Sequence, residues 1–185
     1  MNTKEAINFL QYLTKNKTSF FGLNDLRLWT RDRESLDALR KSLRRHCELG
    51  LFKKIYKDIY INALNSPFKN DLFVGYRLAV MLRPGEFTWE SLESRLSQLA
   101  IISQVPNRLT FMTTGKSGLV KTAMGTFEFS HSPRKRLPKV KYFPDTGILH
   151  ATAQQAWEDL QFVDRNTWMV DLERLEEEIA DEQAA

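Results

Sequence analysis

Apolar residues recur at helical spacing three times within the first 50 residues. The runs 3–15, 24–29 and 30–48 each place apolar side chains three or four positions apart, which predicts three amphipathic helices. Gly50 follows the third run and suits the end of a helix. Candidate N-caps are Thr3, Asn24, and Thr30 or Asp32, and the stripe of the third helix consists of Leu36, Leu39, Leu43 and Cys47.

The pattern changes after the third helix. Residues 51–61, "LFKKIYKDIYI", supply β-forming apolar residues on both sides of Lys57-Asp58, which predicts a β-hairpin with its turn at that pair. Three helices followed by a hairpin are typical of a winged helix-turn-helix, so we expect this fold for residues 1–62. In that fold the third helix enters the DNA major groove and the wing approaches the phosphate backbone.

A second pattern begins beyond residues 62–71, where Asn, Ser and Pro residues indicate a domain boundary. We expect a mixed α+β domain over residues 66–185, which makes the whole chain α+β with two domains. Its expected helices are 70–82, a run that begins at Thr88, 151–163, and a tail helix with Leu172, Leu175 and Ile179; its expected strands are 108–114, 119–123 and 126–131.

The composition is that of a folded protein. Of 185 residues, 42% are hydrophobic and 27% are charged, which is enough apolar material to bury a core. No apolar run reaches the length of a membrane span, and the N-terminus lacks the features of a signal peptide. The single cysteine, Cys47, excludes an internal disulfide framework and suits a reducing compartment. We therefore expect a cytoplasmic protein without a membrane partner.

Charge is distributed unevenly along the chain. Residues 1–62 carry 13 Lys and Arg against 7 Asp and Glu, a net +6, and residues 63–150 carry 12 against 6, also +6. Residues 151–185 carry 2 against 10, a net −8. This asymmetry predicts a polyanionic partner for the first 150 residues and a different partner, or a self-neutralising surface, for the rest.

The third helix carries its cations opposite the leucine stripe. Pairs one turn apart, such as Arg40 and Arg44, repel by roughly 0.2–0.5 kcal/mol, so the helix alone gains nothing from them. A helix that docks on DNA does gain, although a solvated basic face is the alternative. Arg40 is the expected base reader, because arginine bonds guanine bidentately, and the lysines suit phosphates. The predicted DNA-binding residues are Arg31, Arg33, Ser35, Arg40, Lys41, Arg44, Arg45, Lys53, Lys54 and Lys57.

A second basic cluster lies in "SPRKRLPKVK", residues 132–141. Its density equals that of the third helix, so it suits a second nucleic-acid contact, while a solvated basic loop explains it equally well. The residues that would make this contact are Arg134, Lys135 and Arg136.

No catalytic constellation stands out. "TGKSG", residues 114–118, lacks the first glycine of a phosphate-binding loop and is better explained as a turn between strands. The three histidines and Cys47 show no metal-ligand spacing, and Glu128 has no nuclease motif after it. We therefore expect no enzyme activity, no metal and no cofactor, although a nucleic-acid or nucleotide enzyme that depends on Glu128 stays open as a rival.

Four segments, taken in order, resemble the AbiEi family of type IV antitoxins and transcriptional regulators. "LRRHCELGLFKKIYKDIYI" is similar to the family's recognition helix and wing, although Asp58 stands where the wing usually has glycine. "LRPGEFTWESLESRLSQLAIISQVPNRLTFMTTGKSG", "GTFEFSHSP" and "GILHATAQQAWEDL" are similar to its later blocks. The resemblance covers nearly the whole chain through the order and spacing of these segments.

The resemblance implies a particular function. Family members bind inverted repeats in double-stranded DNA at their own promoter through an N-terminal winged helix. Their C-terminal domain neutralises a co-encoded nucleotidyltransferase-type toxin in an abortive-infection system, without a stable complex. The alternative from another class is a protein-interaction module that binds a toxin directly and does not recognise DNA. Neither the oligomeric state nor the operator follows from the sequence.

Overall fold

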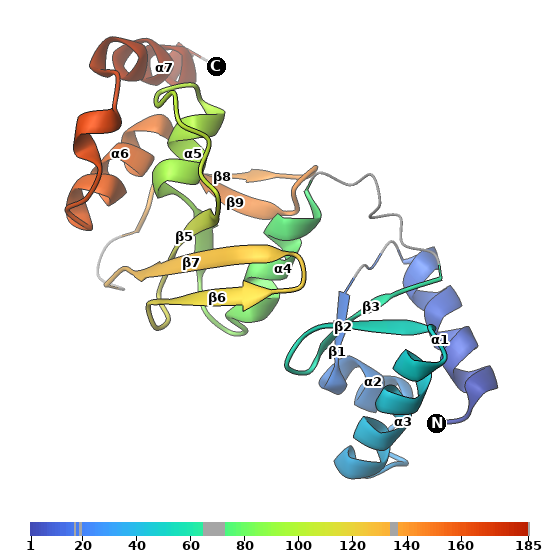
Figure 1. The fold of residues 1–185 in the computed structure, drawn as a ribbon. Helices are drawn as coiled ribbons and strands as arrows, with labels where there is room; N and C mark the ends of the chain where they lie inside the picture. The colour runs from blue at the N-terminus through green and yellow to red at the C-terminus, as the bar shows by residue number, and fades with distance from the viewer. Residues whose placement is uncertain (17, 19, 65–72, 134–136, 185) are drawn as a thin grey trace. The chain divides into compact units, whose positions relative to one another are not determined.

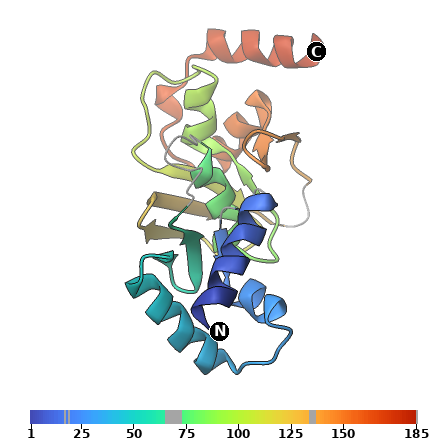
Figure 2. The same cartoon turned by 90° about the vertical axis from the view of Figure 1, so that its right-hand side faces the viewer.

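The structure is a computed structural model that describes residues 1–184 apart from 17, 19, 65–72 and 134–136. The chain is mixed α+β and divides into two compact units, Met1–Val74 and Gly75–Ala185. Figures 1 and 2 show the helices and sheets of both units from two directions. Among the described helices, none combines the length and the apolar character needed to cross a bilayer.

The first unit places three helices against a small antiparallel sheet. The strand order is β1-β3-β2, and β2 and β3 form the predicted hairpin with Lys57 and Asp58 at its turn (Figure 1). Lys57 adopts φ 32°, so this lysine takes the unusual turn conformation next to Asp58. The elements are α1 (Thr3–Lys15), β1 (Phe20–Gly22), α2 (Leu23–Trp29), α3 (Leu36–Glu48), β2 (Phe52–Tyr56) and β3 (Ile59–Asn62).

The first unit begins its helices at residues that the sequence pattern did not single out. Asn2 and Glu5 form a capping box at α1, because each side chain bonds the other residue's backbone N–H at 2.9 Å. Ser35 caps α3, since Arg31 and Asp32 have positive φ values and the backbone there cannot be helical. Gly22 precedes α2. The predicted caps Thr3, Asn24, Thr30 and Asp32 are therefore wrong.

The core of the first unit is rich in aromatic rings. Phe21 of β1 contacts Phe9 of α1 and Phe52 of β2, with ring centroids 5.1 Å apart in both pairs. From α3, Leu39 and Leu43 are fully buried, but Leu36 is 39% exposed because it lies in the first turn of the helix. His46 takes the next buried position, one turn after Leu43. The predicted apolar stripe of α3 is thus correct at Leu39 and Leu43. At its two ends the buried positions differ from the predicted Leu36 and Cys47.

The second unit is built on a six-stranded mixed sheet with the order β6-β7-β5-β4-β9-β8. Two of its pairings are parallel, β4 with β9 and β5 with β7. Its elements are α4 (Val74–Leu82), β4 (Thr88–Glu90), α5 (Leu92–Gln98), β5 (Leu109–Thr113), β6 (Gly118–Thr122), β7 (Gly125–His131), β8 (Val140–Phe143), β9 (Ile148–Ala151), α6 (Ala153–Phe162), the short helix η2 (Thr167–Met169) and α7 (Leu172–Ala184).

Helices cover both faces of this sheet. Trp89 of β4 packs with the buried residues of α5, α6 and α7 on one face. On the other face, Tyr76 of α4 lies 6.4 Å from the Phe111 ring and 5.5 Å from the His150 ring, centroid to centroid. Alternation along each strand separates the two faces, because neighbouring side chains point to opposite sides of a sheet.

The predicted strands 108–114, 119–123 and 126–131 are confirmed as β5, β6 and β7, and the predicted helices 151–163 and 172–179 correspond to α6 and α7. The helix expected from Thr88 is wrong at its start. Thr88–Glu90 is strand β4, held between β5 and β9, and the helix begins only at Leu92. The predicted boundary, residues 62–71, falls mostly outside the described residues.

Candidate nucleic-acid interface

The outer face of α3 carries exposed cations. Leu39 and Leu43 turn into the core, and Arg40, Lys41 and Arg44 are exposed on the rest of the helix circumference. Because these three positions are three or four residues apart or adjacent, they form one continuous surface along the helix. This surface is the candidate site of the first unit.

Arg40 links α3 to the turn of the hairpin. One guanidinium nitrogen lies 3.5 Å from a carboxylate oxygen of Asp37 in the first turn of α3, and the other lies 3.6 Å from a carboxylate oxygen of Asp58. The side chain is 50% exposed, so these contacts are screened by water and cost little to exchange. Arg40 is therefore placed between helix and hairpin, with carboxylates as its present partners.

The other cations of α3 differ in whether their side chains already have a partner. Lys41 is exposed, and within the described part of the chain its side chain forms no ion pair or hydrogen bond. Arg44 is 85% exposed and lies 3.4 Å from Glu48 one turn later. Arg45 instead donates a 2.8 Å hydrogen bond to the Met1 carbonyl oxygen, so it fixes the start of the chain to α3. Lys41 and Arg44 are the better candidates for contacting an anion.

The hairpin next to α3 carries three lysines. Lys53 and Lys54 are consecutive and both exposed, between the buried residues Phe52 and Ile55. The Lys57 ammonium lies 5.3 Å from the centre of the Tyr56 ring, a cation–π contact. Ammonium groups on flexible stems suit phosphates better than base edges.

The residues before α3 are held by local contacts. Arg33 donates from Nε to the Thr30 carbonyl oxygen at 2.9 Å, and one of its terminal nitrogens lies 3.9 Å from Glu5 of α1. Ser35 uses its hydroxyl to cap α3. Arg31 is exposed. Arg33 was expected on the outer face of α3 and is not there, because the helix starts after it.

The second predicted basic contact, Arg134, Lys135 and Arg136, lies outside the described residues. The "TGKSG" segment lies between β5 and β6, as predicted for a turn. There the Ser117 hydroxyl accepts the His131 backbone N–H at 2.8 Å. Among the described residues, no group of three or more His, Cys, Asp or Glu side chains could hold a metal ion.

Two titratable groups of α3, the buried His46 and the partly buried Cys47, have pKa values shifted towards the neutral form. His46 is fully buried, and its Nδ1 donates to the Ser42 carbonyl oxygen at 2.7 Å. Burial lowers the pKa of His46, and the positive charge of Arg45 lowers it further. Burial likewise raises the pKa of the Cys47 thiol. Neither group supplies charge or a nucleophile to the surface above.

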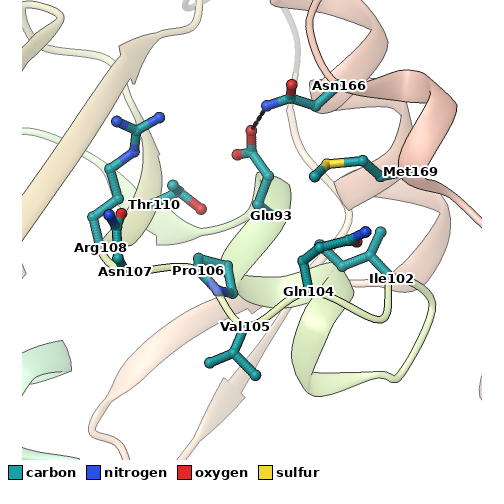
Figure 3. Close-up of a pocket in the computed structure, with 10 residues that line it drawn as sticks. All are labelled: Glu93, Ile102, Gln104, Val105, Pro106, Asn107, Arg108, Thr110, Asn166 and Met169. Atoms are coloured by element: carbon teal, nitrogen blue, oxygen red, sulfur yellow. Dashed lines mark hydrogen bonds between the residues drawn. The ribbon is translucent and has the colours of Figure 1, made fainter.

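The second unit holds a pocket that the sequence did not reveal. Its volume is about 210 Å³, and it lies between the loop 102–108 and the segment 166–169 (Figure 3). Glu93 of α5 lines it, with its carboxylate bonded by Asn166 at 2.7 Å and by Arg165 at 2.9 Å. Burial would raise the pKa of Glu93, but these hydrogen bonds outweigh it and the pKa is lowered.

A buried polar network also joins the strands and helices of the second unit. The Glu90 carboxylate lies 2.5 Å from His150 Nδ1, and His150 Nε2 lies 2.6 Å from the Thr146 hydroxyl. Both Glu90 and His150 are almost fully buried. His150 of β9, held between Glu90 and Thr146, is therefore part of the buried core.

No protein-family model matches the chain, and a search of characterised protein sequences also finds no match. The fold is similar to that of the RV2827C protein from Mycobacterium tuberculosis, known from its crystal structure. That similarity has a TM-score of 0.56 at 13% sequence identity, and covers 97% of this chain and 72% of the other. At this identity the likeness shows a shared fold, which extends over both units of the chain.

Proposed function

We propose that the chain is a DNA-binding transcriptional repressor whose first unit acts as a winged helix-turn-helix. The observation that carries the proposal is the group of exposed cations Arg40, Lys41 and Arg44 on α3, followed by the exposed Lys53 and Lys54 on the hairpin. Three helices and a basic hairpin suit a recognition helix in the major groove with a wing on the backbone.

The two kinds of cation support different roles in this proposal. Lys41, Lys53 and Lys54 are exposed and suit phosphate oxygens, so they supply affinity that is independent of sequence. Arg40 has the fork of donors that guanine O6 and N7 accept. On DNA it would exchange the carboxylates of Asp37 and Asp58 for a base edge. The free-energy cost of this exchange is small, because the site is half exposed.

The resemblance to the AbiEi family supports a more specific role. We propose that the protein represses its own operon in the cytoplasm and acts as the antitoxin of a type IV toxin-antitoxin system. The second unit would then counter a nucleotidyltransferase-type toxin without forming a stable complex with it. The similarity in sequence order, described above, is what supports this part of the proposal.

Binding to the DNA upstream of the gene tests the first part. We expect Arg40→Ala to cost roughly 1–3 kcal/mol on the preferred sequence and to relax the preference. Lys54→Ala should weaken all sequences alike and lower the slope of log affinity against log salt by about 0.9. Fluorescence anisotropy at several salt concentrations measures both effects.

Lys121→Ala is the matched control, because Lys121 is an exposed lysine on a strand of the second unit. It should bind DNA like the parent. If Arg40→Ala and Lys54→Ala also bound like the parent, the assignment of α3 and the hairpin would be wrong. The antitoxin part is tested separately, by co-expressing the chain with the product of the neighbouring gene and measuring growth.

A further inference from the structure

The pocket of the second unit opens through an apolar rim. Val105 is 88% exposed, and Pro106, Ile102 and Met169 line the pocket beside it (Figure 3). Trp168, the residue before Met169 in η2, is 78% exposed. An exposed tryptophan that precedes a pocket-lining residue in the chain is the type of side chain that often dominates binding energy at protein interfaces.

The segment that carries Trp168 is fixed in place. Asp164 and Asn166 both adopt left-handed backbone conformations, with φ values of 50° and 56°. Asn166 bonds Glu93 of α5, and Arg165 contacts both Glu93 and Glu128 of β7, so two elements hold this turn in place. A rim that is already ordered loses little conformational freedom when a partner binds.

Polar groups on the rim suit a peptide backbone. Gln104 and Asn107 line the pocket, both are exposed, and neither side chain forms a hydrogen bond within the described residues. A carboxamide can donate to a peptide carbonyl and accept from a peptide N–H at the same time. The pocket therefore offers an apolar hollow flanked by backbone-binding amides.

The charge next to the pocket is negative. The Asp171 backbone N–H donates to the Ile101 carbonyl oxygen at 2.9 Å, which places the start of α7 beside the pocket loop. Glu173 and Glu176 on α7 are exposed, as is Asp164. The nearby cations are already paired with carboxylates: Arg108 with Glu128, Arg165 with Glu93 and Arg174 with Glu178.

We infer that this pocket, Trp168 and the exposed carboxylates at the start of α7 form a docking site for a cationic segment of another protein. The segment would insert one large apolar side chain into the pocket and place lysines or arginines against Glu173 and Glu176. An anionic nucleic acid or lipid surface is disfavoured by the same carboxylates. The inference stands apart from DNA binding, which uses the first unit.

A peptide selection on the full chain tests the inference. The probe is a phage library of random twelve-residue peptides, and the affinity of each enriched peptide is then measured by anisotropy. We expect enriched peptides to share one large apolar residue flanked by lysine or arginine. Trp168→Ala and Val105→Asp should each weaken these peptides at least tenfold at every salt concentration.

Charge variants separate the two parts of the site. Glu173→Gln with Glu176→Gln should weaken the same peptides at least fivefold in low salt, and the difference should shrink in high salt. Tyr142→Ala is the control, because Tyr142 is an exposed aromatic residue on β8 at the far edge of the sheet. Far-ultraviolet circular dichroism should show that all these variants are folded.

Three outcomes would overturn the inference. The first is that the enriched peptides lack the pattern of one large apolar residue flanked by lysine or arginine. The second is that the peptides still bind both the Trp168→Ala and the Val105→Asp variants as tightly as the parent. The third is self-association of the chain in sedimentation experiments that Trp168→Ala abolishes, because the occupant would then be a second copy. Normal DNA binding by the Trp168→Ala variant is expected throughout and keeps this test separate from the proposed function.

Discussion

Arg40 shows how one side chain can serve both the fold and the proposed function. Its guanidinium reaches the turn of the hairpin through Asp58 and the first turn of α3 through Asp37. Without DNA these carboxylates orient the guanidinium and partly neutralise it.

Asp58→Asn tests this arrangement. The pair is half exposed, so we expect the free energy of unfolding to change by less than about 1 kcal/mol. Removing a negative charge from the surface proposed to face phosphates should tighten DNA binding about threefold to tenfold. Anisotropy and urea unfolding measure the two effects. Glu173→Gln, the same charge change in the second unit, should leave DNA affinity unchanged.

His46 predicts a pH dependence of stability. Burial lowers its pKa in the folded state, whereas the unfolded chain has the ordinary value near 6.5. Below about pH 6.5 the unfolded state therefore binds a proton that the folded state resists. We expect full stability above that pH, and a loss of at most about 1.4 kcal/mol per pH unit as the pH falls below it.

Thermal unfolding of the parent and of His46→Gln at pH 7.5, 6.0 and 5.0 measures this dependence. Glutamine can still donate to the Ser42 carbonyl oxygen but does not titrate. The difference in stability between the two proteins should therefore move in favour of the variant as the pH falls. Parallel pH dependences would show that His46 is not the group responsible.

At the scale of elements, Asp159 of α6 connects the central strand β4 to the helices through hydrogen bonds. Its carboxylate accepts hydrogen bonds from Trp89 Nε1 at 3.0 Å, the Ser91 hydroxyl at 2.6 Å and the Gln155 amide at 2.8 Å. All these groups are buried, so each donor would lose its partner if the carboxylate were removed.

We expect Asp159→Ala to destabilise the second unit by about 3 kcal/mol, because three buried donors are left unpaired. Gln161→Ala, at an exposed position of the same helix, should cost less than about 0.5 kcal/mol. Urea unfolding followed by tryptophan fluorescence compares the two variants. Equal stabilities would mean that water or another group replaces the carboxylate without cost.

Elements with a strong period or a clear turn signal were predictable from the sequence, and several of the short strands were not. Helix α1 and the strands β5 and β7 follow from their own spacing. Residues 88–90 also fit a helical spacing, but they form a strand because β5 and β9 pair with both of its edges. Strands of three or four residues, such as β1, β4 and β9, owe their conformation to partners that lie far away in the sequence.

For the candidate site, the sequence predicted which cations lie on the exposed face of α3, but it did not predict which residues they contact. Periodicity placed Arg40 and Lys41 opposite the buried leucines, as the structure has them. The contacts of Arg40 with Asp58 and of Arg45 with Met1 cross between elements, so helical spacing alone could not reveal them. The pocket of the second unit likewise combines residues more than 60 positions apart, such as Glu93 and Asn166.

At the scale of the whole molecule, the two compact units carry separate cores. We therefore expect two transitions in calorimetry. Asp159→Ala should lower the midpoint of one transition, and His46→Gln should change the pH dependence of the other. A single transition that shifts as a whole in both variants would contradict the prediction, because it would mean that the units unfold together.

The strand order of the second unit has a consequence for synthesis on the ribosome. The central strand β4 needs β9, which the ribosome adds about 60 residues later, whereas every strand of the first unit is complete by Asn62. We expect the first unit to fold while the second unit is still being translated. The unit that we propose to bind DNA would then be complete in a nascent or prematurely terminated chain, before the remainder of the polypeptide has folded.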